Sequence, residues 1–400
     1  MAPQIDDLID PPAGWAPDWL KSDFYAAIIA VLGEDNVCVV GGAVRDSLLG
    51  LSVSDVDMAT TLEPEDVQRL LAGAAIKTIP TGFKHGTVTA VRAGGSCEIT
   101  TLRRDVATDG RYADVSFTDN WKADAERRDF TINALYVTPA GKIFDPVGGL
   151  ADLKQKRVRF IGDAEQRIRE DALRILRFYR FSARFAKQVD KTGQAACASC
   201  VEMIDGLSME RVRDELLKLF LTADVTSVVT LMEKSGVMRR LFGDEWQSDA
   251  IRSYFASESR SKAPVNTLVR LFILSGGLLT ARETASKFKL SNDNRRYLEQ
   301  IELATKDASF ESEAGIRRSF YMFGKAATAA ACVIRDGSHY GLVKRLSEDW
   351  TVPDFPLKGR DLMAQGAEAG PALGGALAEL ELKWIASDFS LTKNQLLDLQ

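Results

Sequence analysis

The sequence predicts an α+β fold in which a small head, built on a mixed sheet, precedes a long helical extension. Between residue 37 and about residue 149, short apolar β-like runs alternate with helical segments. Beyond Gly148 and Gly149, helical periodicity dominates and β-branched runs become rare. A chain of 400 residues is also too long for one ordinary hydrophobic core, so several domains are expected.

Local patterns predict the individual elements of the head. Residues 1–36 are expected to form a leader and a helix, because Trp15 through Leu32 contains apolar residues at helical spacing. The acidic, proline-led start at Glu63 and Pro64 predicts a helix that runs to Ala72. Strands are predicted at Val37–Val40, Asp55–Ala59, Thr87–Arg92, Cys97–Leu102, Thr131–Val137 and Lys142–Phe144.

Composition and charge limit the class of protein. Hydrophobic residues make up 46% and charged residues 27% of the chain, as in soluble globular proteins. The N-terminal sequence lacks the features of a secretory signal, and no apolar run approaches the roughly 18 residues of a membrane span. Five cysteines, an odd number, favour a reducing compartment, so we expect a cytoplasmic protein. The net charge of −5 argues against a basic surface overall but permits a local basic cleft.

Two carboxylates one residue apart, Asp55 and Asp57, are the most informative feature of the head. Side chains i and i+2 of a strand point to one face, so both are expected to project together. They would repel each other without a cation between them, and Mg²⁺ takes hard oxygen ligands that it shares with substrate phosphates. The pair therefore predicts a metal site and catalytic carboxylates for phosphoryl or nucleotidyl transfer. Two solvated strand acids are the alternative.

A turn rich in glycine joins the first predicted strand to a helix at Gly41, Gly42 and Arg45. Glycines permit a close approach of the backbone, a helix N-terminus favours an anion, and an arginine adds a fork of donors. An ordinary tight turn with a surface arginine is the alternative. Because the two carboxylates follow directly, we favour a phosphate-binding turn.

Further candidates depend on this phosphate site. Glu98 lies in the strand-like run CEITTL and is the best-placed third catalytic acid, with a structural ion pair as the alternative. Two adjacent arginines, Arg127 and Arg128, are flanked by acids, which is typical of a salt-bridged surface. Arg128 becomes a candidate triphosphate ligand only beside a phosphate site. Asn133 is a candidate for holding the sugar or a loop through its amide group.

One predicted helix, Glu165–Arg184, carries an unusual series of charges at Asp171, Arg174, Arg177 and Arg180 within an otherwise apolar surface. On a continuous helix, Asp171 and Arg180 would lie about 13.5 Å apart along the axis, enough to reach a base and its phosphates. Arginines that extend out of a core helix into solvent are the alternative. We favour a cleft lined for a nucleotide.

The proximity of Asp171 to Arg174 predicts a choice of base. Cytosine and adenine both present an amino donor beside a ring-nitrogen acceptor, whereas uracil and guanine present a carbonyl acceptor beside an N–H donor. An acceptor (Asp171) next to a donor (Arg174) would accept C and A. It would reject U and G, because a mismatched edge leaves buried polar groups unpaired.

These segments together resemble the class II tRNA nucleotidyltransferases, or CCA-adding enzymes, and the similar bacterial poly(A) polymerases. The matching motifs are VVGGAVRDSLLG with DVDMAT (39–60), KHGTV (84–88), EITTLRRDVATDGR (98–111), ERRDFTINAL (126–135), FDPVGGLADLKQKRVRFIG (144–162) and REDALRILRFYRFSARF (169–185). They cover about the first half of the chain in the family's order.

The resemblance implies a polymerase-β-like nucleotidyltransferase head over 37–149, a helical neck for base recognition over 150–222, and a helical body and tail for tRNA over 223–400. It implies that the acceptor and T arms of tRNA are held, that 103–119 is a flexible loop, and that CTP, ATP and Mg²⁺ are used. Asp55 and Asp57 match the metal ligands; Gly42, Arg45, Arg128, Asp171, Arg174, Arg177 and Arg180 match nucleotide contacts. With only His85 and His339, we expect no HD-domain metal site.

The expected activity is template-independent addition of C, C and A to the 3′ end of tRNA, with release of diphosphate. A poly(A) polymerase is the nearest alternative, and the low isoelectric point, about 5.4, disfavours it. An enzyme restricted to CC or to A addition remains open. A non-catalytic RNA-binding protein is the alternative of another class, although binding alone does not require paired carboxylates.

Overall fold

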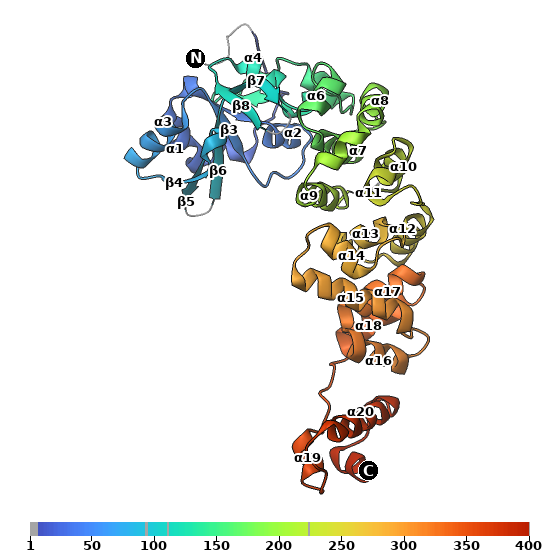
Figure 1. Ribbon diagram of the computed structural model, residues 1–400. Helices are drawn as coiled ribbons and strands as arrows, with labels where there is room; N and C mark the ends of the chain where they lie inside the picture. The colour runs from blue at the N-terminus through green and yellow to red at the C-terminus, as the bar shows by residue number, and fades with distance from the viewer. Residues whose placement is uncertain (1–6, 93–94, 110–111, 223–224, 400) are drawn as a thin grey trace. The chain divides into compact units, whose positions relative to one another are not determined.

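The computed structural model describes residues 7–92, 95–109, 112–222 and 225–399. The chain forms two compact units. The first comprises Met1–Ser208 and Thr222–Leu241, and the second comprises Met209–Leu221 and Phe242–Gln400. The described strands all belong to the first unit, and the second is helical, as Figure 1 shows. The predicted change from a sheet-containing head to a helical extension is therefore confirmed.

The first unit is built on an eight-stranded sheet with the strand order β1-β10-β9-β2-β3-β6-β5-β4. Its strands are β1 (Leu8–Ile9), β2 (Val37–Val40), β3 (Asp57–Thr60), β4 (Lys77–Gly82), β5 (Thr87–Arg92), β6 (Gly95–Thr101), β9 (Tyr136–Val137) and β10 (Ile143–Phe144). Strands β3 and β6 pair in parallel, and the other described neighbours pair antiparallel, so the sheet is mixed as predicted.

Helices α1 (Asp23–Leu32) and α3 (Pro64–Gly73) lie side by side against the sheet, as can be followed in Figure 1. Ser22 caps α1 by accepting a hydrogen bond from the Phe24 amide, and Pro64 occupies the first turn of α3, where a missing N–H costs nothing. The predicted helix over 64–72 is therefore confirmed. The one predicted over Trp15–Leu32 is confirmed only in its second part, because a 3₁₀ turn, η2 (Asp18–Lys21), precedes it.

Strand predictions succeeded at Val37–Val40 and Thr87–Arg92, and two others need correction. The strand expected at Asp55–Ala59 begins only at Asp57, so strand alternation does not explain how Asp55 and Asp57 lie relative to each other. The strand expected at Thr131–Val137 begins at Tyr136.

Residues Thr131–Asn133 instead form a 3₁₀ turn, η5. The Asn133 amide donates to the carbonyl of Phe130, and the Ala134 amide donates to that of Thr131. These local hydrogen bonds take the place of the strand-to-strand hydrogen bonds that the apolar sequence of this segment predicts.

A two-stranded hairpin, β7 (Arg103–Asp109) and β8 (Tyr112–Phe117), occupies the stretch that resembles a flexible loop. Helix α4 (Trp121–Glu126) follows, with the Asn120 side chain capping it through the Ala123 amide.

The remaining helices of the first unit lie between its strands or after the last strand in the chain. They are α2 (Gly42–Leu48), α5 (Gly149–Lys154), α6 (Ala164–Glu170), α7 (Leu173–Phe185), α8 (Lys191–Ser199), α10 (Val225–Lys234) and α11 (Val237–Phe242). Short 3₁₀ turns are η3 (Glu34–Asn36), η4 (Phe83–His85) and η6 (Val201–Gly206).

The continuous helix predicted over Glu165–Arg184 is wrong. It breaks at Asp171, whose backbone is extended (φ −152°, ψ 104°) and whose side chain accepts a hydrogen bond from the Leu173 amide. Aspartate commonly satisfies a free amide at a helix start in this way. The separation of about 13.5 Å expected between Asp171 and Arg180 on one straight helix therefore does not apply.

The second unit consists of helices with two described cores. The helices are α9 (Met209–Leu219), α12 (Asp249–Ser261), α13 (Thr267–Leu274), α14 (Ala281–Lys287), α15 (Asn292–Asp307), α16 (Glu313–Phe323), α17 (Lys325–Arg335), α18 (Tyr340–Asp349), α19 (Gly359–Met363), α20 (Pro371–Ala386) and α21 (Lys393–Leu397). One core includes Ile316 and Phe320, and the other, towards the C-terminus, includes Leu362 and Trp384. In the part of the chain that is described, none of the helices has the length and apolar character required to cross a membrane.

Candidate active site

A cleft of about 480 Å³ in the first unit gathers most of the predicted site residues. Its walls come from the end of β2 and the turn after it, from β3 and β6, from the segment 127–133, and from the start of α7. The predicted residues that line it are Gly41, Gly42, Arg45, Asp57, Glu98, Arg128, Asn133, Asp171, Arg174 and Arg177. Asp55 and Arg180 are not among the described residues of its lining.

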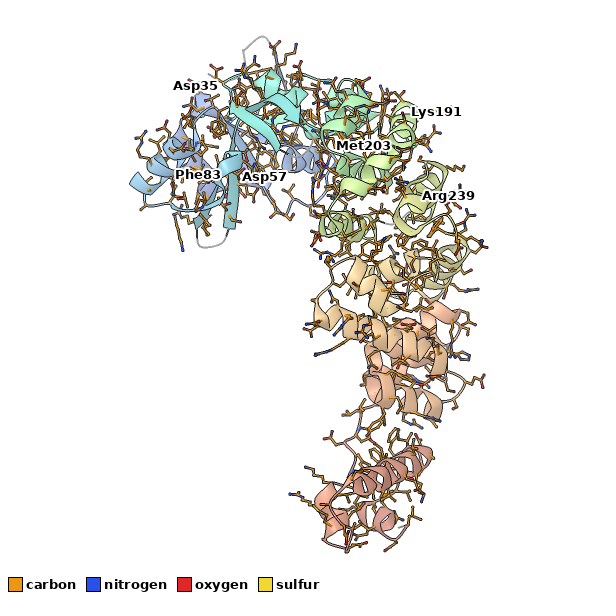
Figure 2. The ribbon with its side chains drawn as sticks, in the orientation of Figure 1. Asp35, Asp57, Phe83, Lys191, Met203 and Arg239 are labelled. Atoms are coloured by element: carbon orange, nitrogen blue, oxygen red, sulfur yellow. The ribbon has the colours of Figure 1, made fainter. Side chains whose placement is uncertain are left out.

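Strand pairing brings the carboxylates of Asp57 and Glu98 to one face of the sheet. Asp57 begins β3, as Figure 2 shows by its label beside the sheet, and it pairs with Val40. The parallel pairing of Met58 with Ile99 places the residues before them, Asp57 and Glu98, on neighbouring strands with the same orientation.

The electrostatics of this face favour a cation. Burial raises the pKa of Asp57 to about 6, and the negative charges of Glu98 and Asp55 act in the same direction, while Arg128 opposes them. Asp55 is exposed and accepts a hydrogen bond from the Ser54 hydroxyl at 2.8 Å. Glu98 and Asp55 are therefore close enough to disfavour the charged form of Asp57.

Hard oxygen donors of this kind suit a divalent metal. Within the described residues, no three His, Cys, Asp or Glu side chains are grouped closely enough to hold a metal ion without other ligands. Mg²⁺ commonly takes one or two carboxylates and completes its shell with waters and substrate phosphates. Asp55 and Asp57 could supply the one or two protein carboxylates that such a Mg²⁺ site requires.

The turn after β2 explains its glycine. Gly41 has a positive φ of 76°, which other residues rarely adopt, and it directly precedes helix α2. A Cβ atom there would lie 3.6 Å from both the Arg128 guanidinium and the Asn133 carbonyl oxygen, which is ordinary van der Waals contact. The backbone conformation at the start of α2, and not a lack of space, therefore favours glycine at this position.

Arg45 is held by the protein more than the sequence suggests. It is only 5% exposed, and it donates to Asp46 at 2.8 Å and to the Asn133 side chain at 2.5 Å. Its guanidinium also lies over the ring of Phe185, 4.3 Å from the centroid. Arg45 therefore reaches the cleft as part of the wall and not as an extended surface arginine.

Asp129 is a site residue that the sequence reasoning missed. It lines the cleft, accepts from Arg177 Nε at 2.7 Å and from Asn133 Nδ2 at 3.0 Å, and so joins two predicted nucleotide contacts. Burial by itself would raise its pKa, but Arg177 and these hydrogen bonds lower it, so the carboxylate is ionised. The sequence feature that could have identified Asp129 as a site residue is its position directly after Arg128. The cleft lining also includes Arg103, Arg127 and Phe181, which the sequence did not single out.

The predicted base-reading pair lies at the break between α6 and α7. Arg174, on the first turn of α7, donates to Glu170 at 2.6 Å, to the Arg167 carbonyl at 2.9 Å and to the Arg127 carbonyl at 3.0 Å. The hydrogen bond to the Leu173 amide fixes Asp171. Both side chains are therefore oriented before any ligand binds. Arg180 lies over the ring of Phe181, 4.2 Å from its centroid.

The chain is similar to several characterised proteins. Residues 37–159 match the family described as Poly A polymerase head domain, and residues 188–247 match the family described as Probable RNA and SrmB- binding site of polymerase A. The mitochondrial CCA tRNA nucleotidyltransferase 1 of Mus musculus is 35% identical over 378 residues, which cover 90% of this chain and 85% of that protein. The CCA-adding enzyme of Streptococcus uberis is 32% identical over 359 residues, which cover 86% of each.

The fold leads to the same group of proteins. The crystal structure of the Bacillus stearothermophilus CCA-adding enzyme in complex with CTP superimposes with a TM-score of 0.78 at 25% identity, over 94% of this chain and 97% of that chain. This likeness confirms the predicted fold class, a polymerase-β-like head with a helical extension. The chain therefore belongs to the family of CCA tRNA nucleotidyltransferases, the CCA-adding enzymes.

Proposed function

We propose that this protein adds C, C and A in turn to the 3′ end of tRNA, using CTP and ATP and releasing diphosphate. One observation carries the proposal: a single cleft is lined by the carboxylates of Asp57 and Glu98 at the sheet and by the Asp171 and Arg174 pair at the helix break. A nucleotide that spans this cleft would present its phosphates to the first group and its base to the second. Membership of the family supports the same reaction.

In this proposal Asp55 and Asp57 hold divalent metal, with Glu98 beside them. The family generally uses divalent metal, and Mg²⁺ is our specific proposal because the donors are carboxylate oxygens. Divalent metal held by Asp55 and Asp57 would supply Lewis-acid chemistry, lowering the pKa of the attacking 3′-hydroxyl and offsetting charge on the leaving diphosphate. Burial first, and then the negative charges of Glu98 and Asp55, raise the pKa of Asp57, and a bound cation would favour its charged form.

The remaining cleft residues would bind and orient the nucleotide. Gly41 and Gly42 admit the triphosphate close to the backbone at the start of α2, and Arg128 supplies positive charge beside it. Arg45, Asn133 and Arg177 are linked through Asp129 into one hydrogen-bonded wall, which would hold the sugar and phosphates in register. Asp171 and Arg174 would read the base.

The tRNA and the location of the protein complete the proposal. We assign 37–149 to the nucleotidyltransferase head, 150–222 to a neck that reads the base, and 223–400 to a body and tail that hold the acceptor and T arms. Arg180 is assigned to nucleotide contact through the family resemblance. The five buried free cysteines support a reducing compartment such as the cytoplasm, although the Mus musculus relative is named mitochondrial.

One assay tests this function against its alternatives. The protein is incubated with Mg²⁺ and a tRNA that lacks its CCA end, with each NTP alone and with CTP and ATP together, and product length is read at single-nucleotide resolution. We expect two additions with CTP alone and three with CTP and ATP. Long tracts from ATP alone would indicate a poly(A) polymerase, and extension by only CC or only A a restricted enzyme. Absence of any extension would indicate a non-catalytic RNA-binding protein.

A further inference from the structure

Asp124 lies behind the cleft and not in it. It occupies helix α4, is 1% exposed, and is absent from the described residues that line the cleft. Its position in the protein interior would be unfavourable for a carboxylate unless nearby donors compensated for the lost hydration. The identity of those donors indicates what the residue does.

The donors around Asp124 belong to the arginines of the cleft. Arg127 donates from Nε to Oδ1 at 2.9 Å, and Arg128 donates from Nη2 to Oδ2 at 3.1 Å. The backbone amide of Arg103, at the start of hairpin strand β7, donates to Oδ1 at 3.1 Å. All three of these arginines line the cleft. One buried carboxylate thus anchors three neighbouring parts of the cleft wall.

Tyr136 completes this arrangement from the sheet. Its hydroxyl, on strand β9, donates to Asp124 Oδ2 at 2.7 Å and accepts from Arg128 Nε at 3.1 Å. The Arg128 guanidinium also lies 5.3 Å from the centroid of the Tyr136 ring. Arg128 is therefore fixed on two sides by groups that are themselves buried.

The charge on Asp124 is maintained by these partners. Burial alone would raise its pKa, but Arg128, Arg127 and the hydrogen bonds from Tyr136 and Arg103 lower it, so the group stays ionised. Removing one member of a buried ion pair leaves the other uncompensated, which is far more costly than losing a surface pair. Neutralising Asp124 would therefore free the orientation of Arg127 and Arg128 without removing either residue.

We propose that Asp124 is a positioning residue that orients Arg127 and Arg128 towards the triphosphate and fixes the start of the β7–β8 hairpin beside them. This inference rests on the proposed function, which places Arg128 beside the triphosphate, and it extends that role to the neighbouring Arg127. Because CTP and ATP share their phosphates, the effect of Asp124 is the same for both nucleotides. An equal effect on CTP and ATP binding distinguishes the role of Asp124 from that of Asp171 and Arg174, which would contact the base.

The test is calorimetric binding of CTP and of ATP, each with Mg²⁺, to the full chain carrying Asp124→Asn. We expect both Kd values to rise by the same factor, roughly ten- to a hundredfold, as for loss of a charge-assisted hydrogen-bond anchor. Asp190→Asn is the matched control: the Asp190 side chain is 7% exposed and pairs with Arg157, and neither residue is among the described residues that line the cleft. This control should lower the melting temperature and leave both Kd values unchanged.

A double-mutant cycle distinguishes positioning from general loosening of the fold. If Asp124 acts through Arg128, Asp124→Asn should raise the Kd much less in an Arg128→Ala background than in the unsubstituted protein. Tyr136→Phe keeps the Asp124 carboxylate and removes only the hydroxyl that bonds it and Arg128. It should raise both Kd values by a smaller common factor, and it replaces Asp124→Asn as the test if that variant does not fold.

Three results would overturn the inference: unchanged Kd values in Asp124→Asn and Tyr136→Phe, full additivity in the cycle, or a change confined to one nucleotide. If the unsubstituted protein bound neither CTP nor ATP, the proposed function itself would fail, and this inference with it.

Discussion

Replacing Arg174 with alanine tests how the base is chosen. The side chain of Arg174 is 14% exposed, and Glu170 and two backbone carbonyls hold its guanidinium in one orientation. A donor fixed in this way pays little entropy when it meets a base. A hydrogen bond to a charged group contributes about 1.5–3 kcal/mol, so we expect the preference for CTP over UTP to fall roughly 10- to 150-fold.

The assay compares kcat/KM for single-nucleotide incorporation of CTP and of UTP on a tRNA that lacks its CCA end. Arg167→Ala is the control, because Arg167 also pairs with Glu170 and its side chain is also 14% exposed, yet it is not among the described residues of the cleft lining. Each substitution should cost about 1–3 kcal/mol of stability through the partly unpaired Glu170. Only Arg174→Ala should change the CTP to UTP ratio. An unchanged ratio in Arg174→Ala, or an equal change in Arg167→Ala, would refute the reasoning.

Three further predictions follow from the structure. Asp57→Asn should abolish nucleotide incorporation, because it removes a metal ligand, while tRNA affinity measured by filter binding stays within about twofold, a change of under roughly 0.4 kcal/mol. Chelation with EDTA should stop incorporation by the unsubstituted protein, and added Mg²⁺ should restore it. Arg270→Met should lower the free energy of unfolding by about 3–5 kcal/mol in urea, because it leaves the buried carboxylate of Glu258 uncompensated.

Each of these predictions has a result that contradicts it. Turnover by Asp57→Asn at a tenth or more of the normal rate would remove Asp57 from the metal site. Activity that persists in EDTA would exclude dependence on a removable metal. For the second unit, replacing both partners (Arg270→Met with Glu258→Leu) should recover much of the lost stability, and equal losses in the single and double variants would count against a buried charge as the cause.

The sequence predicted the parts of the site that depend on local pattern. Gly41 and Asp57 were correctly predicted to share one site, because Val40, directly before the turn, pairs with Asp57 at the start of the next strand, whereas Asp55 is not among the described residues that line the cleft. The helical second half was equally evident, since apolar residues recur at helical spacing over long stretches. The family resemblance also predicted a polymerase-β-like head followed by a helical extension, and the fold has that order.

What the sequence did not predict depends on contacts between distant segments. The helix break at Asp171 was missed because the apolar pattern continues across it, although the Asp171 backbone is extended and its side chain accepts from the Leu173 amide. Asp129 was read as one more acid beside two arginines, since its partner Arg177 is 48 residues away. Asp124 gave no signal, because its importance comes from burial against Arg128 and Tyr136.

The most direct measurement is a crystal structure of the protein with CTP and Mg²⁺ bound. We expect a metal ion at about 2.1 Å from carboxylate oxygens of Asp55 and Asp57. We also expect the amino group of cytosine at Asp171 and its ring nitrogen at Arg174. A metal ion that touches neither carboxylate, or a cytosine edge bound away from the break between α6 and α7, would contradict it.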